Sequence, residues 1–212
     1  MTSHPGPGSA ADRAKAVAHR AAAERGESAA PTAPTAPSAP SGPRPAVVLI
    51  GPPGSGKSTV GAAIGRLTGL PLRDTDSDIE RQAGRSIPEI FIQDGEPVFR
   101  AMERAAVAVG LAEHSGVLAL GGGAILAAET RALLAGHQVI FLSLSMPTGV
   151  RRTGLAVNRP LLAGVNPRAT YKALLDARIP LYREIARHEV ETDNLSVAEV
   201  ARIIIEKLEL TQ

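Results

Sequence analysis

The chain has 212 residues, 44% of them apolar, which suits one domain with a buried core. Three phenylalanines and two tyrosines are its only aromatic residues, which disfavours a binder of single-stranded nucleic acid because nucleobases would have little to stack on. The absence of cysteine excludes disulfides and thiolate zinc sites, and the net charge of only +2 gives no reason to expect a DNA binder.

Residues 1–45 are predicted to form a disordered, alanine- and proline-rich tail ahead of one domain at residues 46–212. The stretch "PTAPTAPSAPSGPRP" places proline at nearly every third position, which favours extended polyproline II over a packed core. The tail carries five basic and three acidic residues, whereas the domain carries 18 of each and is neutral. An organelle transit peptide is the alternative, but the acids Asp12, Glu24 and Glu27 argue against it.

From residue 46 onward, short apolar runs alternate with segments of helical spacing. Strands are predicted at residues 46–50, within 70–76, and at 116–120, 138–144 and 188–192. Helices are predicted at residues 57–68, 77–84, 87–93, 95–114, 168–187 and 197–210, with a break or kink at Pro180. This alternation indicates an α/β fold with three layers, α/β/α, around a central five-stranded parallel sheet. Ligands bind at the carboxyl ends of the strands in such sheets, where the glycine-rich motifs of this chain fall.

The stretch "GPPGSGKST" at residues 51–59 matches the phosphate-loop pattern through Gly51, Gly56, Lys57 and Ser58. Glycines allow backbone N–H groups to surround phosphate oxygens, and the following helix adds its positive N-terminal end. The Lys57 ammonium can reach the terminal phosphates, and the Ser58 hydroxyl can ligate Mg²⁺. Because this pattern lies between a predicted strand and a predicted helix, it predicts binding of a nucleoside triphosphate.

A phosphate loop alone does not identify the reaction. A GTPase would usually carry D-x-x-G and N-K-x-D motifs, and neither occurs in this sequence. Residues 46–212 are also short for a motor protein or an AAA-type ATPase. A small-molecule kinase remains, which needs an acceptor pocket, a group that orients the hydroxyl and a lid against water.

Further motifs follow the phosphate loop in order: "DTDSDIE", "GRSIPEIF", "DGEPVFRAME", "LALGGGAI", "RRTG…NRPLL" and "IPLYRE". In order and spacing they resemble the shikimate kinases, and the resemblance covers residues 46–210. It implies a phosphate-loop kinase fold with a mobile lid. It also implies ATP- and Mg²⁺-dependent phosphorylation of shikimate at its 3-hydroxyl, a step of chorismate and aromatic amino-acid biosynthesis.

The resemblance implies an acceptor site built around charged side chains. Asp76 would face the transferred 3-hydroxyl as its orienter, with a role as general base left open. Arg100 and Arg178 would clamp the carboxylate of shikimate, which a guanidinium does bidentately. Glu103 lies three residues after Arg100, so it is interpreted as a residue that orients this guanidinium.

The same site would include backbone and apolar contacts. The glycine triplet, Gly121, Gly122 and Gly123, would let the backbone approach the ring, with the Gly122 N–H as donor. Phe99, together with Ile87, would supply an apolar wall, although Phe99 is equally expected to be a core residue because it lies on the apolar side of its helix.

For ATP, the resemblance implies that Arg159 swings over the phosphates in the transition state, from a lid at about residues 153–169. Arg152 would pack on the adenine. The predicted catalytic residues are Asp76, Lys57 and Arg159. The predicted ATP-binding residues are Gly54, Ser55, Gly56, Lys57, Ser58, Thr59, Arg152 and Arg159.

The three carboxylates of "LRDTDSD" are predicted to have different roles. By resemblance, Asp74 lies near Mg²⁺, through water, so that Ser58 and Asp74 form the predicted metal site. Asp78 falls in the first helical turn, where a carboxylate favours the helix dipole, and is expected to be exposed. Ser77 or Thr75 is expected to cap that helix.

The alternative that stays open is another small-acid kinase, such as a gluconate kinase, which also needs a cation for a carboxylate, although the paired "FR" and "LYR" sites favour the cyclic acid. A nucleoside monophosphate kinase would share the fold but needs a base pocket, for which the sequence offers no candidate. A non-catalytic regulatory module would be expected to have lost Lys57 or Asp76, and both are present. ATP and shikimate are the expected partners, with no nucleic acid and no membrane. A cytoplasmic monomer is expected.

Overall fold

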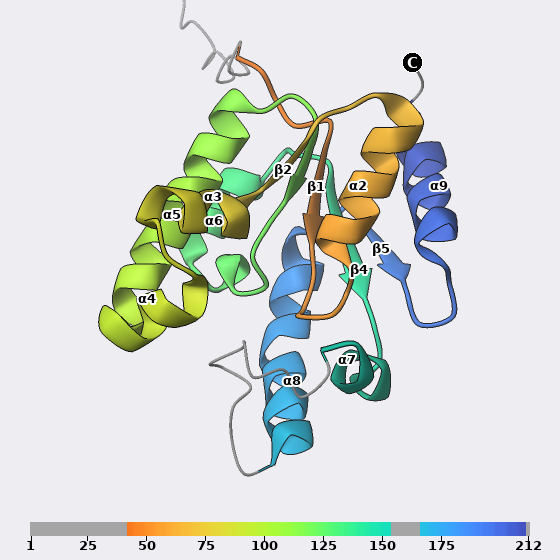
Figure 1. The fold of residues 1–212 in the computed structure, drawn as a ribbon. Helices are drawn as coiled ribbons and strands as arrows, with labels where there is room; N and C mark the ends of the chain where they lie inside the picture. The colour runs from red at the N-terminus through yellow and green to blue at the C-terminus, as the bar shows by residue number, and fades with distance from the viewer. Residues whose placement is uncertain (1–41, 154–165, 211–212) are drawn as a thin grey trace, which may run out of the picture. The chain divides into compact units, whose positions relative to one another are not determined.

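A computed structural model of the protein describes residues 42–153 and 166–210 (Figure 1). The predicted tail therefore lies outside the described residues except for its last four positions, and so does most of the predicted lid, including Arg159. Residues 42–212 form one compact unit, and the fold below is that of its described part. No helix in this part is long and apolar enough to cross a membrane.

The core of the fold is a five-stranded sheet in which every pair of neighbouring strands is parallel, as the sequence predicts. The strands are β1 (Val47–Ile50), β2 (Leu72–Asp74), β3 (Val117–Ala119), β4 (Val139–Ser143) and β5 (His188–Glu191). Their order in space is β2-β3-β1-β4-β5, so β1 lies at the centre between β3 and β4. The loop after β1 therefore opens at the point where the winding of the chain reverses, which is where ligands bind in open α/β sheets.

Eight α-helices and one short 3₁₀ helix connect the strands within the described residues. They are α2 (Lys57–Thr68), α3 (Thr75–Ala83), α4 (Ile87–Gln93), α5 (Gly95–Glu113), η1 (Ala124–Leu126), α6 (Ala128–Leu134), α7 (Met146–Thr153), α8 (Pro167–Ile185) and α9 (Val197–Leu208). The sequence predicted α2 and α4 to the residue, and it missed the short helices α6 and α7. The sequence predicted a break or a kink at Pro180, and the break is wrong because α8 continues through this residue.

The helices cover both faces of the sheet (Figure 1). On one face, α2 and α9 pack through Ile64 and Ile204 against Leu49. On the other face, α5, η1 and α8 pack against Val48 and its neighbours, with Tyr182 of α8 stacked on Phe141 at 4.9 Å between ring centroids. This alternation along β1 explains why the strand is apolar at every position and fully buried.

Candidate functional site

The phosphate loop runs from β1 into α2 at the carboxyl edge of the sheet. Gly54 and Gly56 have positive φ angles of 83° and 88°, which a glycine adopts without strain. The loop also packs closely on α7, because a Cβ atom at Gly54 would lie 3.1 Å from Thr153 Cγ2. Gly56 is the N-cap of α2 and has no side chain to accept from the first N–H groups of this helix.

The ammonium group of Lys57 lies against its own loop. Its Nζ donates to the carbonyl oxygens of Gly51 at 2.8 Å and Pro52 at 3.3 Å. These bonds hold the charge at the mouth of the loop, where it can meet an anion.

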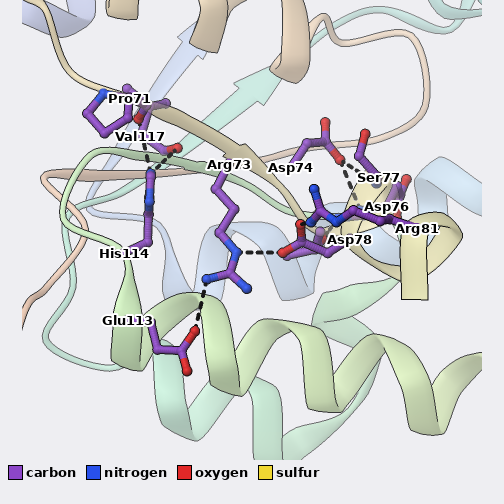
Figure 2. Close-up of polar contacts among 12 residues, drawn as sticks. Pro71, Arg73, Asp74, Asp76, Ser77, Asp78, Arg81, Glu113, His114 and Val117 are labelled. Carbon is purple, nitrogen blue, oxygen red and sulfur yellow. Dashed lines mark hydrogen bonds and ion pairs between the residues drawn. The ribbon is translucent and has the colours of Figure 1, made fainter.

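Asp74, the last residue of β2, connects the phosphate loop to the acceptor side. Its Oδ2 accepts from Ser58 Oγ at 2.5 Å. Its Oδ1 accepts from the backbone N–H of Asp76 at 3.0 Å and of Ser77 at 3.4 Å (Figure 2). Asp74 is therefore the N-cap of α3, and the expectation that Ser77 or Thr75 caps this helix is wrong. A carboxylate satisfies the orphan N–H groups and also favours the positive end of the helix.

Asp78 is not the exposed residue that the sequence suggested. Its side chain is only 12% exposed and forms ion pairs with Arg73, at 2.5 Å, and with Arg81. Arg73 also contacts Glu113 of α5 at 3.3 Å, so the pair ties the start of α3 to α5 (Figure 2). Asp78 thus has a structural role in these ion pairs, whereas Asp74 and Asp76 line a cavity.

A cavity of about 430 Å³ brings together the predicted nucleotide residues that the structure describes. It is lined by Gly54, Ser55, Gly56, Lys57, Ser58, Thr59, Asp74, Asp76, Gly122 and Arg152, together with Pro53, Val60, Leu120, Thr192, Leu195, Val197 and Val200. The phosphate loop, the two aspartates and Gly122 of the glycine triplet therefore line the same cavity. Arg100, Arg178 and Phe99 do not line it.

The glycine triplet after β3 lies close to predicted acceptor residues and to the phosphate loop. A Cβ atom at Gly121 would collide with Asp76 Oδ1 and would lie 2.8 Å from Glu103 Oε1. At Gly122 it would lie 3.3 Å from Pro53 Cδ of the phosphate loop, and at Gly123 it would collide with the Arg100 guanidinium. Side chains are excluded here because the acceptor groups and the phosphate loop meet at this turn.

Hydrogen bonds fix the conformation of the triplet. The Gly121 N–H donates to Thr75 Oγ1 at 3.0 Å, and the Gly121 carbonyl accepts from the Ala124 N–H at 3.1 Å. Among the described residues, no acceptor bonds the N–H of Gly122 or Gly123. The Gly122 N–H is thus left with the capacity to donate to a ligand, which is the role predicted for it.

The two predicted carboxylate-binding arginines are held from behind by protein groups. Arg100 Nη1 contacts Glu103 Oε2 at 2.7 Å, and Arg100 Nη2 contacts Glu96 Oε1 at 2.8 Å. Arg178 is buried and donates through Nη1 to the Gly122 carbonyl at 3.0 Å. Burial raises the pKa of Glu103 above its usual value, while the charge of Arg100 acts in the opposite direction. These partners orient both guanidinium groups around the same turn.

Phe99 is a core residue in this structure. It is 4% exposed and packs with Ile79 and Ile90, with its ring 4.7 Å from that of Phe91. The Arg100 guanidinium carbon lies 5.3 Å from the centre of its ring. These contacts favour the core role of Phe99 over the role of an apolar wall for the ligand. Phe99 also supports Arg100 through a cation–π contact.

Arg152 of α7 reaches the cavity from the far side of the phosphate loop. Its Nη1 donates to Thr192 Oγ1 at 2.8 Å and its Nη2 to the Thr192 carbonyl at 2.5 Å. Asp193 holds the start of α7 by accepting from the Ser145 N–H at 2.9 Å. Thr192 therefore orients the Arg152 guanidinium in the cavity, which is also lined by the apolar residues Leu195, Val197 and Val200. The sequence did not predict Thr192 as a site residue.

No cluster of three metal-ligating side chains occurs among residues 42–153 and 166–210. The two predicted metal residues, Ser58 and Asp74, are in hydrogen-bond contact and line the cavity beside the phosphate loop. Mg²⁺ is commonly held by one or two protein oxygens together with water and substrate phosphates. A hydroxyl and a carboxylate at the mouth of a phosphate loop fit that requirement.

Besides Thr192, three further buried hydroxyl residues of the site were not predicted: Thr75, Tyr171 and Tyr182. Thr75 carried a signal, since it stands between Asp74 and Asp76 in the motif. The tyrosines carried no recognisable signal, because their partners are loops more than 50 positions away in the chain.

A family model described as shikimate kinase matches residues 53–209. A shikimate kinase of Saccharopolyspora erythraea is 58% identical over 164 residues, which cover 77% of this chain and 94% of the relative. One of Streptomyces avermitilis is 56% identical over 168 residues, or 79% of this chain and 98% of the relative. A solved structure of the shikimate kinase from Acinetobacter baumannii in complex with shikimate is 36% identical with a TM-score of 0.75, and the match covers 79% of this chain and 93% of that one.

Proposed function

The chain belongs to the shikimate kinase family, and from this premise we propose that it transfers the γ-phosphoryl group of ATP to the 3-hydroxyl of shikimate. The products would be shikimate 3-phosphate and ADP. The observation that carries the proposal is the shared turn at Gly121–Gly123, where Asp76, Arg100 and Arg178 surround a backbone that also contacts the phosphate loop.

In this proposal, the phosphate loop binds the triphosphate of ATP. Backbone N–H groups of Gly54–Thr59 and the uncapped start of α2 would donate to the phosphate oxygens. Lys57 would move its ammonium from the loop carbonyls to the terminal phosphates, which strengthens electrophilic character at the transferred phosphorus. The adenine would lie toward Arg152, where the cavity is lined by Leu195 and Val197.

Shikimate would bind on the other side of the glycine triplet. Arg100 and Arg178 would hold its carboxylate. Each charge-assisted hydrogen bond contributes roughly 1.5–3 kcal/mol, so these bonds would account for much of a micromolar affinity. The Gly122 N–H would donate to a ring hydroxyl. Phe99 would act through Arg100 rather than as an exposed wall.

Asp76 would then act on the acceptor hydroxyl. Its carboxylate would accept a hydrogen bond from the 3-hydroxyl and direct a lone pair of that oxygen at the γ-phosphorus. As the new P–O bond forms and the bond to the leaving ADP oxygen breaks, the hydroxyl proton would pass to the carboxylate. Mg²⁺ held by Ser58 and Asp74 would neutralise charge on the phosphates. Arg159, outside the described residues, keeps its predicted role in stabilising that charge.

An acceptor panel tests the function. ADP release would be measured with shikimate, gluconate and nucleoside monophosphates at saturating MgATP, with reactions that lack any acceptor as the control. Turnover with shikimate alone is the expected result. Turnover with gluconate or a nucleotide, and none with shikimate, would replace the proposed acceptor by that compound.

A further inference from the structure

The two tyrosines of the chain are both on α8, and both are buried there, with exposures of 1% for Tyr171 and 0% for Tyr182. The Tyr171 hydroxyl donates to the Pro53 carbonyl at 2.7 Å, and the Tyr182 hydroxyl donates to the Gly122 carbonyl at 2.5 Å. One carbonyl belongs to the phosphate loop and the other to the glycine triplet. One helix therefore reaches both loops of the site with the same chemical group.

Each of these bonds fixes the direction of a peptide unit. In a trans peptide, the C=O of one residue and the N–H of the next point in opposite directions. The bond from Tyr171 draws the Pro53 carbonyl toward α8, and the N–H of Gly54 in the same peptide is thereby directed away from α8. Gly54 lines the cavity, and its N–H has no acceptor among the described residues. Tyr171 thus sets the direction of an N–H group on the phosphate side.

Close packing at α7 keeps the Tyr171 hydroxyl in place. The ring lies so near Gly149 of α7 that a Cβ atom there would collide with the phenol. Gly149 in turn contacts the phosphate loop, because its carbonyl oxygen lies 3.4 Å from a Cβ atom placed on Gly54. Figure 1 shows α7 and α8 side by side below the ends of the strands. Tyr171, Gly149 and Gly54 therefore form one tight junction.

The second bond acts in the same way on the acceptor side. The Gly122 carbonyl accepts from both Tyr182 and Arg178, which lie one turn apart on α8. The N–H of Gly123 belongs to the same peptide and is directed to the opposite side of the turn. Tyr182 thus sets the direction of a second N–H group at this turn, in addition to the Gly122 N–H that is proposed to donate to a ring hydroxyl. Burial raises the pKa of Tyr182 well above its usual value, so the phenol keeps its proton as a donor at every pH at which the protein is handled.

We propose that Tyr171 and Tyr182 are positioning residues that orient the two loops separately, Tyr171 for the phosphates of ATP and Tyr182 for shikimate. The proposal rests on the proposed function for the identity of the acceptor. Neither phenol contacts the reacting atoms in this scheme. Each acts through a peptide unit, and hydrogen bonding to the carbonyl also polarises that unit so that its N–H becomes a better donor.

The test removes one hydroxyl at a time and keeps the ring. In Tyr171→Phe, KM for ATP and the dissociation constant of ADP should rise about threefold or more, with KM for shikimate unchanged. The reason is that the N–H directed by Tyr171 would donate less well to the phosphates, and a net neutral hydrogen bond contributes about that factor to binding. In Tyr182→Phe, KM for shikimate should rise by a similar factor, with the ADP dissociation constant unchanged. Each variant is the matched control of the other, since both lose a buried hydroxyl from the same helix.

The crossed pattern distinguishes positioning from a general effect on folding. A KM value does not depend on the amount of active enzyme, so a lower yield of folded variant would not disturb it. Equal shifts of both KM values in both variants, or no shift in either, would overturn the proposal. If the wild-type protein fails to phosphorylate shikimate, the proposed function fails instead, and the ADP dissociation constants of Tyr171→Phe and wild type still decide the role of Tyr171.

Discussion

Ser58 Oγ lies 2.5 Å from Asp74 Oδ2, although the two residues are 16 positions apart in the chain and belong to different elements. The start of α2 and the end of β2 therefore present two oxygen ligands together at the edge of the cavity. Asp74 also caps α3, so it has a structural role and a proposed metal role in one side chain.

Two substitutions separate these roles of Asp74. Asp74→Asn keeps a capping oxygen but loses the charge, so the Mg²⁺ concentration for half-maximal activity should rise about tenfold or more while stability stays close to wild type. Asp74→Ala should show the same metal defect and also lose about 1 kcal/mol of unfolding free energy, because the cap is gone. Magnesium titrations of activity and urea unfolding would measure the two effects. An unchanged magnesium dependence in both variants would contradict the metal role.

Asp76→Asn should lower turnover about 100-fold or more and leave the ADP dissociation constant nearly unchanged, because the acceptor hydroxyl loses its acceptor group and proton carrier. Steady-state kinetics and calorimetric ADP titration would measure the two quantities. The matched control is Asp78→Asn, two positions along the chain, whose carboxylate pairs with Arg73 and Arg81. Near-normal turnover in Asp76→Asn would remove this residue from the mechanism.

Arg100→Lys should raise KM for shikimate about tenfold, with a smaller change in turnover, because an ammonium keeps the charge beside Glu103 but loses the bidentate geometry. Arg104→Ala on the exposed side of the same helix is the control and should behave as wild type. Initial rates over a range of shikimate concentrations would show the effect. A defect confined to turnover would argue against a carboxylate-binding role for Arg100.

The raised pKa of Glu103 predicts a specific pH dependence of stability. Because the folded-state pKa lies above the ordinary value of 4.5, the folded protein binds this proton more tightly than the unfolded chain does. The contribution to stability is then fully present below pH 4.5 and is lost as the pH rises through the folded pKa. The unfolding free energy of wild type should therefore fall relative to that of Glu103→Gln between pH 5 and 8 in urea titrations. A difference that stays constant over this range, or that grows in favour of wild type, would show that the carboxyl group does not have a raised pKa.

The parts of the fold that could be predicted are those determined by local sequence. The limits of α2 follow from a glycine loop before it and Gly69 after it, and the strands follow from short apolar runs. The segment "MPTGVRRT" was missed as α7 because proline, threonine and glycine are weak helix formers, and its helix is held by packing on α8. The predicted roles of Asp76, Arg100 and Arg178 come from family resemblance and not from local pattern.

The contacts that hold the site could not be predicted because they join distant positions. The bond from Tyr171 to Pro53 spans 118 positions and that from Tyr182 to Gly122 spans 60. Nothing in the spacing of these residues indicates which carbonyl each phenol meets. The cap at Asp74 was also missed, since the choice among neighbouring capping residues depends on where the strand ends.

The uncapped start of α2 has a thermodynamic consequence. Gly56 supplies no side-chain oxygen, so the helix lacks the side-chain bond of an ordinary N-cap, a difference of about a few tenths of a kcal/mol for glycine. The phosphates of the nucleotide would complete this helix, as a capping side chain does elsewhere. The protein is then most stable when nucleotide is bound, and its melting temperature should rise with the nucleotide concentration.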